Sequence, residues 1–376
     1  MGDSVWSSLL PDLLVSIAIK IQLVEDFMAF RGVCTSWRAA AHVDKFVKSW
    51  PKVPLLMLAE KEDSDDREFY SLSRGRIWRT LSLPEAKGKK CIESRGWLMT
   101  IGKSGDVNLL HPFSGVQIEL PHLSTFPAHE LEVDPCFFVI KAVLSASPSH
   151  TSEFVLVVVG GAGRFLGFWR PGVKSWTRME SSPNGAFNDV NFYNGAFNDV
   201  NFYNGKCYAI TYGGDIWVWD ISDPTAAHYG FTIDRELIKF RESYLVESDG
   251  ELLIVARDGA ALEDDDEETY GATNFRVIQL DLIKRGWKEI TNVGERAIFV
   301  GHNGAFSIDA TSFPNVIKPN CIYFTDDAIE AYTFTQQGGG KDMGVYNLED
   351  GGRIERFDGV QSFSLIGPPV WVAPSF

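Results

Sequence analysis

Residues 275–290 read FRVIQLDLIKRGWKEI, and this stretch decides the fold because its pattern occurs six times along the chain. A run of strand-forming residues ends at a polar position, a short Gly- or Ser-containing turn follows, and a second run carries Trp or Ile. Such a pattern predicts a β-hairpin. The other copies are FYSLSRGRIWRTLSL (69–83), DVNLLHPFSGVQIEL (106–120), FLGFWRPGVKSWTRM (165–179), DIWVWDISDP (215–224) and MGVYNLEDGGRIERF (343–357).

Two more strands precede most of these hairpins, for example CIES (91–94) and GWLMTI (96–101) before the second copy. Four strands repeated every few dozen residues are typical of a β-propeller, so we expect six blades of four strands from about residue 53 onward. The first unit is one strand short, because only PLLMLA (54–59) precedes its hairpin. We therefore expect residues 369–374, from PPVWVAP, to close the first blade. A two-sheet β-sandwich is the alternative.

One ten-residue segment is duplicated without change: NGAFNDVNFY occupies residues 184–193 and again 194–203. Ten is an even number, so a second copy preserves which side chains of a strand face inward. One copy suffices for a blade. We interpret the other as a recent tandem duplication, or a sequence-assembly error, accommodated in a surface loop or extra hairpin.

The composition narrows the range of partners. Among 376 residues, 35 Lys and Arg against 50 Asp and Glu leave a formal charge of −15, which disfavours nucleic acid as a partner. The five cysteines are scattered without C-x-x-C spacing, so we expect neither disulfides nor a zinc site, and a reducing compartment. The most apolar stretch, residues 154–169, contains Arg164 and four glycines. We therefore expect no membrane association and place the protein in the cytoplasm, the nucleus or both.

No pattern in the chain predicts a catalytic, metal or cofactor site. In VVVGGAGRFLGF (157–168) the third position of a G-x-G-x-x-G motif falls on Leu166 and a strand follows, so a β-turn is the better interpretation. The acidic run 263–268 lacks the ligand spacing of a calcium loop and is expected to be a solvated loop tip. The seven histidines show no metal spacing, and His111 is expected to bond within its turn.

The N-terminal region differs from the rest, because apolar residues between Ser4 and His42 recur at helical spacing. LLPDLLVSIAIKI (9–21) and VEDFMAFRGVCTSWRAAA (24–41) resemble an F-box, in the order Leu-Pro, paired leucines, a spaced Ile, and Val-Cys-x-x-Trp-Arg. The usual acidic residue before Ile17 and the loop proline are missing. Leftover apolar surface on such a small helical unit marks a partner site.

The F-box resemblance implies docking to a Skp-type adaptor, and through it to a cullin. It places Leu10, Pro11, Leu14 and Ile17 in the adaptor groove. The resemblance counts Val33, Cys34 and Trp37 among the adaptor-binding residues as well, with the role of fixing the second and third helices. Trp37 is equally compatible with an ordinary core position.

The remainder resembles the KIB-type propeller of plant F-box proteins, through NCIYFTDD (320–327), DMGVYNLEDG (342–351) and PPVWVAPSF (368–376). The expected organisation is a small all-α F-box at 4–45, a linker at 46–52 and an all-β propeller at 53–376. The resemblance implies the substrate receptor of an SCF-type (Skp-cullin-F-box) ubiquitin ligase, which binds a target protein and has no catalysis of its own.

Two other functions stay open at this level. One is a propeller enzyme with polar groups converging on the central channel, which the F-box-like segment and the lack of a nucleophile and base disfavour. The other is an F-box-like protein acting outside ubiquitination, which the departures after Ile17 allow. Loop composition does not identify the target protein or the propeller face that binds it.

Overall fold

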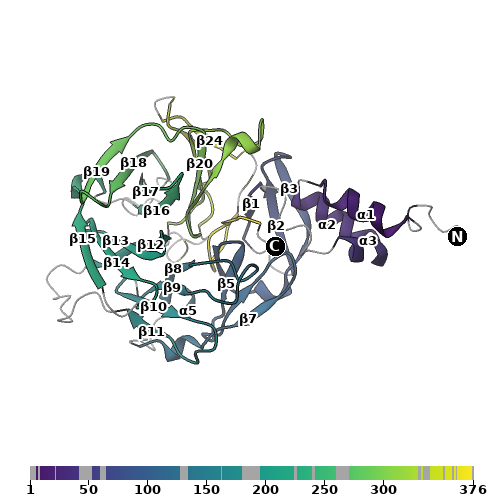
Figure 1. Ribbon diagram of the computed structural model, residues 1–376, viewed down its shortest axis with the longest axis horizontal. Helices are drawn as coiled ribbons and strands as arrows, with labels where there is room; N and C mark the ends of the chain where they lie inside the picture. The colour runs from purple at the N-terminus through teal and green to yellow at the C-terminus, as the bar shows by residue number, and fades with distance from the viewer. Residues whose placement is uncertain are drawn as a thin grey trace.

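Six β-sheets stand around a common centre, and the helices near the N-terminus lie outside the ring that they form (Figure 1). The computed structural model describes residues 6, 9–21, 23–41, 53–59, 65–127, 134–161, 163–179, 195–223, 227–238, 242–259, 271–328, 332, 339–349, 352–357, 360 and 362–374. This arrangement confirms the predicted six-bladed propeller and rules out the β-sandwich.

The first five blades are four-stranded and antiparallel throughout. The first contains β25 (Val370–Val372), β1 (Leu55–Met57), β2 (Asp66–Ser71) and β3 (Arg76–Ser82). The second contains β4 (Lys90–Ser94), β5 (Trp97–Ile101), β6 (Val107–Leu110) and β7 (Gln117–Glu119), and the third β8 (Val139–Leu144), β9 (Leu156–Gly160), β10 (Phe165–Trp169) and β11 (Thr177–Met179). The fourth contains β12 (Phe197–Tyr203), β13 (Lys206–Thr211), β14 (Asp215–Asp220) and β15 (Ala227–Thr232), and the fifth β16 (Glu242–Ser248), β17 (Glu251–Asp258), β18 (Asn274–Asp281) and β19 (Gly286–Ile290).

The sixth blade differs from the expected four strands. It contains β20 (Arg296–Val300), β21 (Phe306–Asp309), β22 (Cys321–Phe324), β23 (Gly344–Asn347) and β24 (Ile354–Arg356), in the order β21-β20-β22-β23-β24. β20 and β22 are parallel, whereas the other pairs are antiparallel. β21 takes the inner edge beside β16, and β20 is inserted between β21 and β22. A parallel pair needs a long return connection, which leaves no hairpin signal in the sequence.

The ring is closed by the C-terminal strand, as predicted. β25 pairs with β1 in the register Leu55↔Val372, Leu56↔Trp371 and Met57↔Val370. Because side chains alternate along a strand, Val370 and Val372 pack between the first two blades, and Trp371 packs toward the sixth. All three side chains are fully buried.

The predicted hairpins form the outer strands of the blades, and their polar positions bond within the turns. The Asp220 carboxylate accepts from the Ser222 N–H at 2.9 Å, and the Asn347 side chain accepts from the Glu349 N–H at 2.9 Å. His111 bonds to the hydroxyl of Ser114, a residue of its own turn, at 2.8 Å. The second NGAFNDVNFY copy supplies β12, while the first lies outside the described residues.

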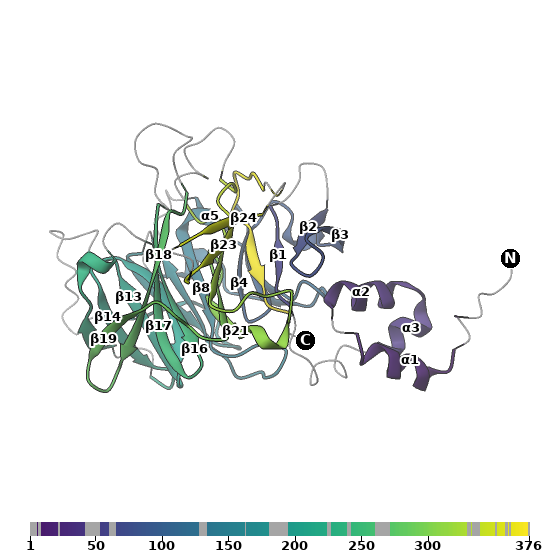
Figure 2. The ribbon, with the colours of Figure 1, turned by 90° about the horizontal axis from the view of Figure 1, so that it is seen from above.

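The helices near the N-terminus are α1 (Pro11–Ala18), α2 (Val24–Gly32) and α3 (Thr35–Ala40), here called the helical unit; another short helix, α5 (Pro135–Phe138), precedes β8. α2 joins the helical unit to the first blade (Figures 1 and 2). Val24 packs among the core residues of that blade, and the Asp26 carboxylate forms an ion pair with Arg74 at 2.5 Å. The expected linker at 46–52 lies outside the described residues.

Candidate functional site

An exposed apolar surface covers one side of the helical unit. Leu10 and Val33 expose 67% and 55% of their surface, and Leu13, Ile17 and Ile19 are also exposed. Leu10, Leu13 and Ile17 follow the i, i+3, i+7 spacing that places side chains on one face of α1. We call the surface formed by Leu10, Leu13 and Ile17 the apolar face; Val33, at the end of α2, is a further exposed apolar residue of the helical unit.

The predicted adaptor-binding residues divide into two groups in the structure. Leu10, Pro11, Ile17 and Val33 are exposed and available to a partner. Leu14 has no exposed surface and belongs to the core of the helical unit with Ala18, Phe27 and Phe30. Its assignment to an adaptor groove therefore does not fit its position: Leu14 supports the apolar face from below.

Trp37 and Cys34 lie between core and surface. The Trp37 ring packs on Phe30 with a centroid separation of 4.4 Å, and its indole N–H donates to the Trp6 carbonyl at 3.0 Å. Cys34 is half-buried and starts α3 in an extended conformation. Through its contact with Phe30, Trp37 packs α3 against α2, while Cys34 stands at the junction of the two helices. Leu13 was part of the sequence motif but not of the predicted site, because spacing alone does not reveal exposure.

At the centre of the propeller, residues 301–305 cross the axis between β20 and β21. Lys141 of the third blade donates to the Gly301 carbonyl at 2.6 Å, and the Gly304 N–H donates to the Glu93 carbonyl of the second blade at 2.6 Å. Asn201 of the fourth blade donates to the Ala305 carbonyl at 3.0 Å. Three blades thus hold this stretch, which we call the plug segment, through their innermost strands.

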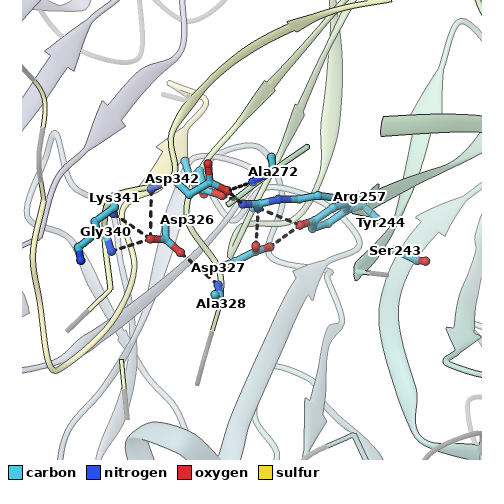
Figure 3. A network of polar contacts seen from close by, with 12 residues as sticks. Ser243, Tyr244, Arg257, Ala272, Asp326, Asp327, Ala328, Gly340, Lys341 and Asp342 are labelled. Atoms are coloured by element: carbon cyan, nitrogen blue, oxygen red, sulfur yellow. Dashed lines mark hydrogen bonds and ion pairs between the residues drawn. The ribbon is translucent and has the colours of Figure 1, made fainter. Parts of the chain in front are cut away.

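Beside the plug segment, buried Arg257 of β17 organises the connection between β22 and β23 (Figure 3). Its guanidinium donates to Asp327 at 2.6 Å and to the Thr325 carbonyl at 2.8 Å, and it also pairs with Asp342. The Tyr244 hydroxyl donates to Asp327 at 2.5 Å. Burial is the largest influence and lowers the pKa of Arg257, but Asp327, Tyr244 and Asp326 together raise it more, so the group stays charged.

A second carboxylate fixes the same connection from its other side. Asp326 accepts the backbone N–H groups of Gly340 and Lys341 at 2.7 and 2.8 Å (Figure 3). Charge-assisted bonds of this kind, inside a buried network, hold residues 325–328 and 339–342 in a single arrangement. The network is therefore structural, and its acidic groups are engaged in holding the backbone.

The described residues offer little for catalysis. No group of three or more His, Cys, Asp or Glu side chains among them is arranged to hold a metal ion. Cys91, Cys136, Cys207 and Cys321 are buried, and burial raises the pKa of the Cys136 and Cys207 thiols, which disfavours the reactive thiolate. Gly161 and Gly163 adopt positive φ in the turn after β9, as the β-turn interpretation expected. In the part of the chain that is described, no helix combines the length and apolar character needed to cross a membrane.

The fold and the helical unit define a class of protein, a closed propeller that carries a small helical unit with an exposed apolar face. The family model described as "KIB1-4 beta-propeller" matches residues 69–347, and the chain belongs to that family. Its relatives from Arabidopsis thaliana carry F-box names. Putative F-box protein At5g55150 is 26% identical over 87% of this chain and 86% of its own length. F-box protein SKIP23 is 22% identical over 98% and 95%, and putative F-box/kelch-repeat protein At5g24040 is 22% identical over 98% and 98%.

Proposed function

We propose that this chain is the substrate-recognition subunit of an SCF-type ubiquitin ligase. In this proposal the helical unit docks a Skp-type adaptor, the adaptor connects the chain to a cullin, and the propeller binds the target protein. The chain performs no catalysis, because the cullin-bound machinery transfers ubiquitin.

The apolar face is the observation that carries the proposal. Exposed leucine, isoleucine and valine side chains gathered on a small helical unit are costly to leave in water and are typical of a protein-binding surface. The F-box names of the relatives point to the same partner class. We place the chain in a reducing compartment, the cytoplasm or nucleus, because its five cysteines are scattered without C-x-x-C spacing.

The plug segment weighs against the alternative of a propeller enzyme. Such an enzyme would use polar groups around an open axial channel, whereas here residues 301–305 occupy the axis and bond to three blades. The polar groups beside them are engaged in the Arg257 network. An F-box-like role outside ubiquitination predicts weak adaptor binding and therefore no recruitment of the cullin, so co-purification of the adaptor and the cullin separates the two.

Adaptor binding tests the proposal directly. Changing Leu10 and Pro11 together to Ala should weaken binding of a Skp-type adaptor by about 2–4 kcal/mol, because both are exposed at the start of α1 and Leu10 is a central apolar anchor. The measurement is titration calorimetry with purified full-length chain. A matched double variant, Val116→Ala with Val173→Ala, removes exposed apolar side chains of the propeller and should bind normally. Equal affinity of the Leu10/Pro11 variant and the wild type would contradict the proposed docking surface.

A further inference from the structure

Four asparagines of this chain are followed directly by glycine, and one of them stands exposed in a tight turn. They are Asn184, Asn194, Asn204 and Asn303. The first two lie outside the described residues, so the structure compares Asn204 with Asn303. An asparagine before glycine carries its own reactive pair. The amide carbon of its side chain lies within reach of the next backbone nitrogen, and glycine has no Cβ to block the approach.

Asn204 and Gly205 form the whole turn between β12 and β13. Their φ angles of 46° and 73° are both positive, which is typical of a type I′ turn, and Tyr203 and Lys206 on either side form the last pair of the ladder. Asn204, Gly205 and Lys206 are exposed, and no atom lies within 4 Å of the place where a Gly205 Cβ would stand. Neither the Asn204 side chain nor the Gly205 N–H is hydrogen-bonded to another described residue. The two reacting groups are therefore free to meet.

Asn303, in the plug segment, precedes glycine in the opposite surroundings. It has no exposed surface, and its side-chain N–H donates to the Gly304 carbonyl at 3.1 Å. The Gly304 N–H donates to the Glu93 carbonyl at 2.6 Å. Reaction at Asn303 would need the buried plug segment to open first, which costs much more free energy than opening a two-residue turn at the surface. Asn303 is therefore an internal control within the same chain.

We propose that Asn204 is a site of self-modification by deamidation. The Gly205 nitrogen loses its proton and bonds to the Asn204 Cγ, the side-chain nitrogen leaves as ammonia, and a succinimide ring closes. Water then adds to either carbonyl of the ring and breaks the bond of that carbon to the Gly205 nitrogen, which gives aspartate or isoaspartate. The inference goes beyond the proposed function and does not rest on adaptor binding.

The two products differ in their effect on the hairpin. Aspartate leaves the main chain unchanged, and Asp-Gly favours the same type I′ turn. Isoaspartate routes the main chain through the side-chain carbons of residue 204, so a two-residue turn no longer keeps Tyr203 paired with Lys206. Asn201, earlier on the same strand, donates to the Ala305 carbonyl of the plug segment at 3.0 Å. Isoaspartate therefore loosens the end of a strand that holds the plug segment.

Timed incubation of the full-length chain at mildly alkaline pH tests the site, because the backbone nitrogen must lose a proton. Chymotrypsin cleaves after aromatic residues and separates the two sites, as NGKCY (204–208) and VGHNGAF (300–306). Mass spectrometry detects the exchange of an amide for a carboxyl group, and an isoaspartate methyltransferase with labelled S-adenosylmethionine identifies isoaspartate. A zero-time sample corrects for reaction during digestion. We expect Asn204 to convert at least about a hundredfold faster than Asn303.

A matched variant separates this modification from general ageing of the protein. Asn204→Gly removes the reactive amide and leaves Gly-Gly, which also suits a type I′ turn. Its melting temperature before incubation shows that it is folded. After incubation, we expect the wild type to melt at a lower temperature in step with its isoaspartate content, and the variant to keep its melting temperature.

A synthetic peptide, acetyl-FYNGKCY-amide, shows that the conditions permit the reaction. Conversion of this peptide while Asn204 of the protein stays unmodified would overturn the proposal, as would equal rates at Asn204 and Asn303. A chain that contains isoaspartate and melts like fresh protein would show that the hairpin accepts the change, and would remove the expected loss of stability. Adaptor binding plays no part in these measurements, so their failure leaves the proposed function untouched.

Discussion

Neighbouring residues of one helix have opposite roles in this protein. Leu13 is exposed on the apolar face, while Leu14, one position later, has no exposed surface. The helical period predicts that the two point in different directions, but it does not say which faces the partner. That depends on where α2 and α3 pack, which is a tertiary outcome. The sequence was therefore enough to identify the F-box-like motif. The structure was needed to tell its exposed residues, which are available to a partner, from its buried residues, which support them.

Buried Glu93 makes the stability of the propeller depend on pH. Burial raises the pKa of its carboxyl to about 8, although its Oε1 accepts N–H bonds from Gly96 at 2.7 Å and Ala373 at 3.3 Å. Its Oε2 has no hydrogen-bond partner within the described part of the chain. The folded state keeps the proton to higher pH than the unfolded state does, so this contribution is complete below about pH 4.5 and is lost as the pH rises through 8.

Glu93→Gln should remove that dependence, since glutamine keeps an accepting oxygen and does not ionise. We expect the variant to gain about 4–5 kcal/mol of unfolding free energy over the wild type at pH 9, and progressively less toward pH 5. Denaturant melts of both proteins across this range give the difference directly. Asp220→Asn, at an exposed turn, serves as the control; a Glu93→Gln effect that stays constant with pH would contradict the buried-proton account.

At the scale of the element, local pattern predicts hairpins well and inserted strands poorly. The outer strands of every blade follow from turn residues and alternating apolar positions, which act over a few residues. The parallel pair β20–β22 and the plug segment depend on contacts between blades that are distant in sequence. Neither has a local signature, so the sequence did not predict the fifth strand of the sixth blade or the plug segment.

The plug segment depends on a glycine that tolerates no side chain. Gly301 has a φ of 148°, and a Cβ atom there would collide with the Thr325 hydroxyl. Gly301→Ala should therefore lower the unfolding free energy by about 2–3 kcal/mol, through backbone strain and overpacking together. Thermal unfolding measures it.

A second glycine separates the two causes. Gly172 has a φ of 87° with no atom within 4 Å of an added Cβ, so Gly172→Ala bears the backbone cost alone, about 1 kcal/mol. Equal losses in the two variants would show that the plug segment rearranges to admit the methyl group.

For the molecule as a whole, the ring closes where the last strand of the propeller, β25, pairs with the first, β1. This pairing connects the first blade to the last one. Closure was predictable by counting: one blade lacked a strand, and one strand at the far end lacked a blade. The sequence did not reveal how much packing follows from it. Trp371 contacts Phe299, Tyr323 and Phe357 of the sixth blade, with ring centroids 5.1, 6.1 and 6.0 Å away. A three-residue strand thus links the first blade to both neighbours.

Deleting residues 369–376 should therefore cause aggregation or a large fall in melting temperature. The deletion exposes the edge of β1 to other chains, and loss of the Trp371 side chain alone is worth about 3–5 kcal/mol. Light scattering and thermal unfolding measure the two effects.

A transposed variant sharpens the test. Because Val372 pairs with Leu55, residues 369–374 can be moved to directly before residue 53 and joined to it by an Asn-Gly turn, which makes β25 and β1 a hairpin. If the strand itself closes the ring, the transposed chain regains most of the lost stability. A stable deletion variant, or a transposed chain as unstable as the deletion, would show that closure does not rest on this strand.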